Sequence, residues 1–160
     1  MANYAARTNL ELLFGTVSLA KWADLDNNKN PVTIDERITW ACETATEYVN
    51  SRLKSGRYDV PFSSVPKIIV YITAMYAGIL LYDSRLILGD STTVDQVSRH
   101  RKEFEKKMRQ ILAGQLKLLH PTTGDLLDSN AELHPSVADM EPEDETDCPT
   151  CQCYSCTCGE

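Results

Sequence analysis

Motifs for catalysis are missing from this sequence. Its seven glycines are scattered, so it has no glycine-rich loop to cradle a phosphate, and no Gly-x-Ser-x-Gly nucleophile elbow occurs. None of the three histidines is spaced from a carboxylate or a cysteine as in a zinc enzyme. His120 and His134 each precede a proline, where an imidazole would be poorly held. We therefore expect a protein without enzymatic activity.

Long apolar runs are also few. The longest stretch without a charged residue, Ile68 to Tyr82, has 15 residues, whereas a membrane-spanning helix needs about 20 apolar residues. The amino terminus has neither the basic start nor the continuous apolar stretch of a secretory signal. The sequence thus predicts a soluble protein, without a membrane partner, in which residues 68–82 form a buried helix.

An excess of charge is absent from residues 1–138, which carry 16 acidic and 16 basic side chains. The net charge of −7 comes from the last segment, which has no lysine or arginine and contains Asp139, Glu141, Glu143, Asp144, Glu145, Asp147 and Glu160. A body without charge excess carries no general signature of nucleic-acid binding.

Capping signals and apolar periodicity are present, and they predict five helices. Thr8 with Glu11 resembles a capping box for a short helix that ends at Gly15, and residues 16–25 fit a second short helix. Thr33 with Glu36 predicts the start of a longer helix that runs to about Lys54. Its apolar stripe consists of Ile38, Ala41, Cys42, Ala45, Val49 and Leu53.

Two more long helices are expected after the proline-rich connection. Pro66 suits the first position of an apolar helix, in which Gly78 indicates a close approach by another helix. Thr93 is the expected cap of the last helix, whose inward residues are Val94, Val97, Phe104, Met108, Ile111 and Leu112. The predicted fold is all-α: a small bundle of two short and three longer helices with an extended C-terminal arm. The expected regions are a body (1–118), an acidic arm (119–147) and a cysteine-rich tail (148–160).

Trp40 does not fit the apolar stripe of its helix. At 100° per residue it points away from the stripe, onto a face shared with three acidic residues: Glu36, Glu43 and Glu47. Two interpretations stay open. Either the short amino-terminal helices cover Trp40, or it is an aromatic anchor for another subunit.

The last helix has a basic outer face. Six basic and two acidic side chains lie between Arg99 and Arg109, among them the candidate interface residues Arg99, Arg101, Lys102 and Lys106. A solvated helix face is the default interpretation. The alternative is a docking face for an acidic partner or a phosphate backbone. On this face no aromatic residues interleave the basic ones, which argues against sequence-specific recognition of a nucleic acid.

The cysteines concentrate in the tail, at Cys148, Cys151, Cys153, Cys156 and Cys158. Only one residue separates the two C-x2-C pairs, so the spacing is closer to metallothionein-like wrapping of a metal, with zinc as the candidate, than to a zinc ribbon. Disulfides between subunits and free thiols are the other interpretations that stay open. Cys42 lies on the apolar stripe and is expected to be an inert buried thiol.

The stretch "VNSRLKSGRYDVPFSSVPKIIVYITAMYAGILLYDSR", with "NLELLFG" before it and "MRQILAGQLKL" after it, resembles the Mu-like phage family of small head-to-tail connector (adaptor) proteins. The resemblance covers about residues 4–118. The family's most recognisable turn matches Arg57, Tyr58, Pro61 and Pro66, which we expect to shape the bundle. The cysteine tail departs from the family pattern.

The resemblance implies a structural virion protein with no required cofactor. Such adaptors form a ring, commonly dodecameric, that binds the phage portal protein and a neck or tail component while genome DNA passes through its channel without sequence-specific binding. It also implies assembly in the bacterial host cytoplasm and a place at the head-tail junction. Two alternatives remain: a metal-binding interaction module that uses the tail cysteines, and a DNA-packaging accessory protein that uses the basic helix.

Overall fold

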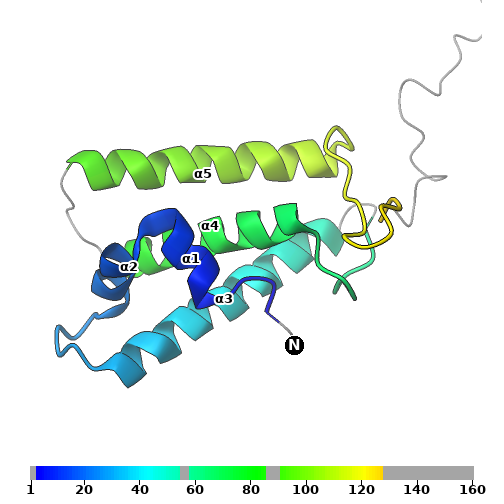
Figure 1. Ribbon diagram of the computed structural model, residues 1–160. Helices are drawn as coiled ribbons and strands as arrows, with labels where there is room; N and C mark the ends of the chain where they lie inside the picture. Colours follow the sequence, from blue (N-terminus) through cyan, green and yellow to red (C-terminus); the bar gives the residue numbers. More distant parts are fainter. Residues whose placement is uncertain (1–2, 55–57, 86–90, 128–160) are drawn as a thin grey trace, which may run out of the picture. The chain divides into compact units, whose positions relative to one another are not determined.

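The computed structural model describes residues 3–54, 58–85 and 91–127, except for the side chains of 91–93. Five α-helices make up most of these residues. No strand occurs in these ranges, so the predicted all-α bundle of two short and three longer helices is confirmed. The helices, shown in Figure 1, are α1 (Arg7–Phe14), α2 (Thr16–Ala23), α3 (Pro31–Lys54), α4 (Lys67–Ser84) and α5 (Ser91–Leu112).

The apolar helix α4 lies at the centre of the bundle. It packs against α3, α5, α1 and α2, with α3 and α5 on opposite sides of it (Figure 1). By length and composition alone α4 would pass for a membrane span. Half of this helix is buried inside the bundle, from Ile69 near its start to Leu81 near its end. This burial is the one expected for the core helix of the bundle.

Four helix starts differ from those predicted from the sequence. Helix α1 begins at Arg7 rather than after Thr8, because the Asn9 side chain accepts a hydrogen bond from the Ala6 N–H at 2.8 Å. Glu11 pairs instead with Arg7 at 2.7 Å. The predicted Thr8–Glu11 box was therefore wrong.

Helix α3 begins two residues before Thr33, at Pro31. Asn30 caps it, since its side chain accepts a hydrogen bond from the Val32 N–H at 3.1 Å. Proline suits this first position because its missing N–H would have no partner there. Helix α5 likewise begins at Ser91, so Thr93 lies inside it and is not its cap. Pro66 lies one residue before α4, as its N-cap.

Stacked aromatic rings join the three long helices. Tyr48 of α3 stacks on Tyr76 of α4, with ring centroids 4.4 Å apart, and Tyr76 stacks on Phe104 of α5 at 4.8 Å. Aromatic pairs of this kind add stabilisation beyond the area they bury. Val94, predicted to face inward in α5, is 43% exposed and lies outside this core. It stands in the first turn of α5, before the inward stripe begins at the buried Val97.

The amino-terminal segment is tied to the body through Tyr4. Its N–H donates to the Thr46 hydroxyl at 3.1 Å, and its own hydroxyl donates to Asn50 at 2.6 Å. The same hydroxyl accepts a hydrogen bond from the Phe62 N–H at 2.9 Å. Burial raises the pKa of Tyr4. One side chain thereby joins the amino terminus, α3 and the connection between α3 and α4.

The chain does not leave the bundle directly after α5. Leu118 is buried, and Leu119 pairs with Leu126 in an antiparallel bridge that closes a short turn. Leu116 and Leu127 pack against the core cluster to which Phe104 and Ile111 belong. The rest of the expected arm and the whole cysteine-rich tail lie outside the described residues, so the predicted region boundaries stay predictions.

Candidate interaction surfaces

Trp40 stands on the outer face of α3, and its side chain is 52% exposed. The short amino-terminal helices leave about half of this side chain uncovered, and its role as an interface anchor stays a prediction. It borders a shallow hollow of about 410 Å³. We call this region the Trp40 surface; its lining residues are Val32, Asp35, Glu36, Thr39, Trp40 and Glu43.

A second hollow, of about 240 Å³, is also lined by Trp40, together with residues that include Trp22, Leu25 and Leu81. Trp22 itself is buried, with its ring 5.2 Å from that of Phe14 and 5.4 Å from that of Tyr82. The two tryptophans thus differ in role. Trp22 fills the core, and Trp40 is a large, half-exposed side chain that lines both hollows.

The Trp40 surface is acidic. Asp35 pairs with Arg7. Glu36 and Glu43 are exposed, and so is Glu47, one turn further along α3; none of them has an ion pair among the described residues. An exposed tryptophan with unpaired carboxylates around it suits a partner that is both apolar and basic.

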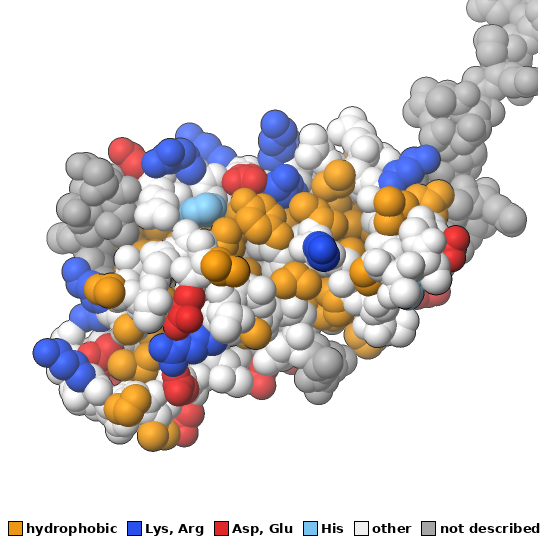
Figure 2. Space-filling view, viewed as in Figure 1, with side chains coloured by type: hydrophobic (Ala, Val, Ile, Leu, Met, Phe, Trp, Pro, Cys, Tyr) orange, Lys and Arg blue, Asp and Glu red, His pale blue; other side chains and the backbone are white. Residues whose placement is uncertain are grey.

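The α5 basic face consists of Arg99, Arg101, Lys102 and Lys106, all of which are exposed. Arg101 makes two hydrogen bonds to the Asp83 carboxylate, at 2.7 and 3.0 Å. Arg99, Lys102 and Lys106 have no ion pair within the described part of the chain. Figure 2 shows lysine and arginine side chains gathered along the edge formed by α5.

His100 is turned inward from this face. Its ring meets the Phe14 ring edge-on with centroids 4.9 Å apart, and its Nδ1 is buried without a hydrogen-bond partner. Burial is the main cause that lowers the pKa of His100; Arg99 lowers it further and Glu103 opposes the shift. Among the described residues no carboxylate is hydrogen-bonded to this imidazole as a catalytic base would require, so we interpret His100 as a packing residue.

Three of the four residues of the family turn lie in the described part of the chain, and Arg57 lies outside it. Their expected role in shaping the bundle stays a prediction. Tyr58 is buried and its hydroxyl points to the Ile111 carbonyl at 3.5 Å. Pro66 is buried at the start of α4, whereas Pro61 is exposed. The turn therefore joins the start of α4 to the end of α5.

The cysteine cluster at positions 148–158 lies outside the described residues, so its three interpretations stay open. Within the described ranges no group of histidine, cysteine or acidic side chains could hold a metal ion. Cys42 is buried, and desolvation raises the pKa of its thiol to about 11. A thiol with this pKa is neutral at physiological pH and is a poor nucleophile.

Comparison with known proteins relates this chain to a phage protein family. A protein-family model described as Bacteriophage Mu, Gp36 matches residues 4–134. No curated protein matches the chain. The match includes all five helices and confirms the resemblance to a Mu-like phage family that the motifs between residues 4 and 118 indicated.

Proposed function

The chain belongs to the Bacteriophage Mu Gp36 family, and from this membership we propose that it is a head-to-tail adaptor of a tailed phage. In this role copies of the chain form a ring beneath the portal and link it to the neck or tail. The family supports the coarser statement, a structural protein associated with a phage virion. The family match is the single observation that carries the proposal.

The distribution of charge supports assembly into a ring. A closed ring uses heterologous contacts, in which one patch of a subunit meets a different patch of the next. The acidic Trp40 surface belongs to α3 and the basic face belongs to α5, and these helices lie on opposite sides of α4 (Figure 1). We propose that the Trp40 surface of one copy meets the α5 basic face of the next, with Trp40 as the apolar anchor.

The remaining partners follow from the ring. One rim binds the portal protein, the other receives the neck or tail component, and genome DNA passes through the lumen without sequence-specific contacts. No catalytic step and no cofactor is required. Trp40 and the unpaired charges of both surfaces carry this function through binding alone, because repeating a modest contact around a ring multiplies its effect.

The direct test mixes the purified full chain with its cognate portal protein under reducing conditions and images the particles by electron microscopy. An added ring of matching symmetry on the portal is the expected result. A portal that gains no density would overturn the proposal.

Charge variants then test the contact between subunits. We expect the variant Glu36→Lys with Glu43→Lys to lose the ring, because it places like charges against the α5 basic face. Arg99→Glu with Lys102→Glu should restore the ring when combined with it. Asp59→Lys, an exposed charge reversal outside both surfaces, is the matched control.

A further inference from the structure

A pair of leucines is displayed on the turn that follows α5. The Leu127 N–H donates to the Leu118 carbonyl at 2.9 Å, and the His120 N–H donates to the Asp125 carbonyl at 2.7 Å. These two bonds flank Leu119 and Leu126, which makes them a non-hydrogen-bonded antiparallel pair with adjacent side chains on one face.

The two faces of this ladder have opposite environments. Leu118 and Leu127 point toward the bundle, where Leu118 is buried and Leu127 packs on the core. Leu119 and Leu126 are 51% and 50% exposed. Because successive side chains in the two short segments point to opposite faces, Leu119 and Leu126 are both exposed to solvent. The two backbone hydrogen bonds hold them in position. We call Leu119, Leu126 and the exposed Asp125 of the same turn the leucine knob.

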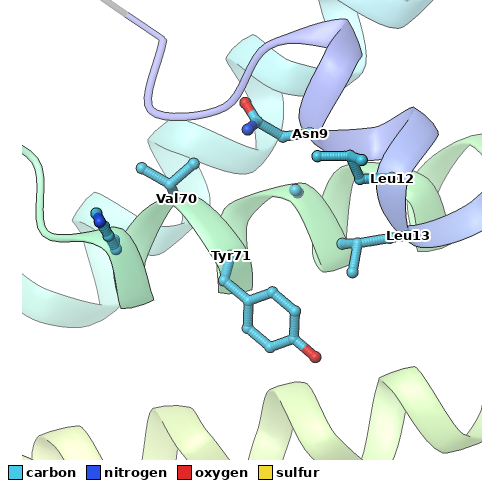
Figure 3. A pocket seen from close by; sticks show the side chains of 7 residues that line it. Asn9, Leu12, Leu13, Val70 and Tyr71 are labelled. Carbon is cyan, nitrogen blue, oxygen red and sulfur yellow. The ribbon is translucent and has the colours of Figure 1, made fainter.

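An apolar groove of about 270 Å³ lies between α1 and α4. Figure 3 shows Leu12 and Leu13 reaching from α1, with Val70 and Tyr71 on the α4 side. Leu12 is 85% exposed. A hydrogen bond from the Tyr71 hydroxyl to the Glu103 carboxylate, at 3.2 Å, holds the Tyr71 ring in position. The groove is thus an apolar depression with an ordered wall and an uncovered leucine at its edge.

The groove and the leucine knob carry charges of opposite sign. Lys67, the first residue of α4, is the single charged residue among those that line the groove, and it has no ion pair within the described ranges. Asp125 on the knob has no ion pair in the described residues either. The groove therefore offers an apolar surface with an unpaired cation, and the knob offers an apolar surface with an unpaired carboxylate.

We infer that the leucine knob of one copy docks in the α1–α4 groove of a second copy, with Asp125 near Lys67. The knob does not fill the groove of its own chain, since half of each knob leucine and most of Leu12 are exposed to solvent. Knob and groove consist of different residues, so the contact is heterologous and repeats from copy to copy. The inference rests on the proposed ring in one respect, that copies of the chain associate.

Sedimentation velocity of the full chain under reducing conditions tests the contact. Leu126→Ser and Leu12→Ser should each weaken self-association about tenfold or more, because each removes a leucine that is buried on docking. Val17→Ser is the matched control, since Val17 is 83% exposed and does not line the groove. Circular dichroism should show unchanged helix content in all three variants.

Mixing the two defective variants gives a sharper outcome. A Leu126→Ser copy retains its groove and a Leu12→Ser copy retains its knob, so one intact contact forms between them. The mixture should associate more tightly than either variant alone. A photo-crosslinking residue at position 126 should also link to residues 9–13 or 67–74 of an isotopically labelled second copy.

The charge pair gives an independent check. Lys67→Glu and Asp125→Lys should each weaken association about threefold, the effect of an exposed ion pair, and the double reversal should recover it. Lys21→Glu, on the exposed side of α2, is the control. If the knob and groove variants associate like the wild type while Glu36→Lys with Glu43→Lys does not, this inference is overturned and the proposed ring stands. A wild-type chain that stays monomeric also overturns it, and portal imaging then decides the adaptor function separately.

Discussion

The Phe14 ring lies against Gly78 so closely that a Cβ atom on Gly78 would overlap it. Phe14 is the last residue of α1, and Gly78 lies in the middle of the core helix α4. The same ring contacts Trp22 and His100. One residue without a side chain therefore lets α1 approach α4, and this approach positions the aromatic residues between α1, α2 and α5.

Gly78→Ala should destabilise the fold by about 1–3 kcal/mol, the usual cost of overpacking a core. Alanine normally stabilises a helix interior relative to glycine by about 1 kcal/mol, so the direction of the change reports the steric overlap. Urea denaturation measures the free energy of unfolding. Combining Gly78→Ala with Phe14→Leu should recover part of the loss, and a stabilised Gly78→Ala protein would contradict the packing described here.

Trp40→Ala should leave the free energy of unfolding nearly unchanged, because half of the side chain is exposed in the single chain. The same change should abolish assembly of the ring, because it removes the proposed apolar anchor. Trp22→Ala is the matched comparison. Trp22 is 3% exposed, so its truncation should cost about 3–5 kcal/mol. Thermal unfolding and electron microscopy with the portal separate the two effects. A Trp40→Ala chain that still forms rings would remove Trp40 from the interface.

Stability should fall as the pH drops below about 6.5, the ordinary pKa of histidine, because of His100. Its pKa is lowered in the folded chain, so the unfolded chain binds the proton first and is stabilised by it. The contribution of neutral His100 to the free energy of unfolding is present above the pKa of the unfolded chain and is lost as the pH falls towards the lower pKa of the folded chain. Chemical denaturation at pH 7.5 and pH 5 measures the difference. His100→Phe should remove this part of the pH dependence while retaining the contact with Phe14.

Cys42 should resist alkylation in the native chain. With a pKa of about 11, about one thiol in a thousand is ionised at pH 8, and burial blocks the reagent as well. Peptide mapping after treatment with iodoacetamide distinguishes Cys42 from the tail cysteines. Denaturant should make Cys42 fully reactive. Rapid native labelling at pH 8 would show that the α3 stripe opens to solvent.

Several features could be predicted from local sequence because their causes are local. Gly15 ends α1 as expected, and the stripe from Ile38 to Leu53 is buried along α3. Helix starts were less predictable, since Asn30, three residues before Thr33, caps α3 and Pro31 is its first residue. The bridge between Leu119 and Leu126 was missed because a single residue pair has too little alternation to be recognised in a sequence.

The sequence by itself determined the helical class, the central apolar helix and the family, because periodicity, proline and glycine positions act over a few residues. Periodicity placed Trp40 on the acidic face of α3, but tertiary structure alone decided that about half of its side chain stays exposed, since the packing of the short helices determines how much of it is covered. It also decided which charges stay unpaired. Arg101 finds Asp83 from another helix, 18 positions away in the chain, whereas Lys102 next to it finds no ion-pair partner in the described residues. Such pairings depend on where helices meet, and that arises from the packing of the whole bundle.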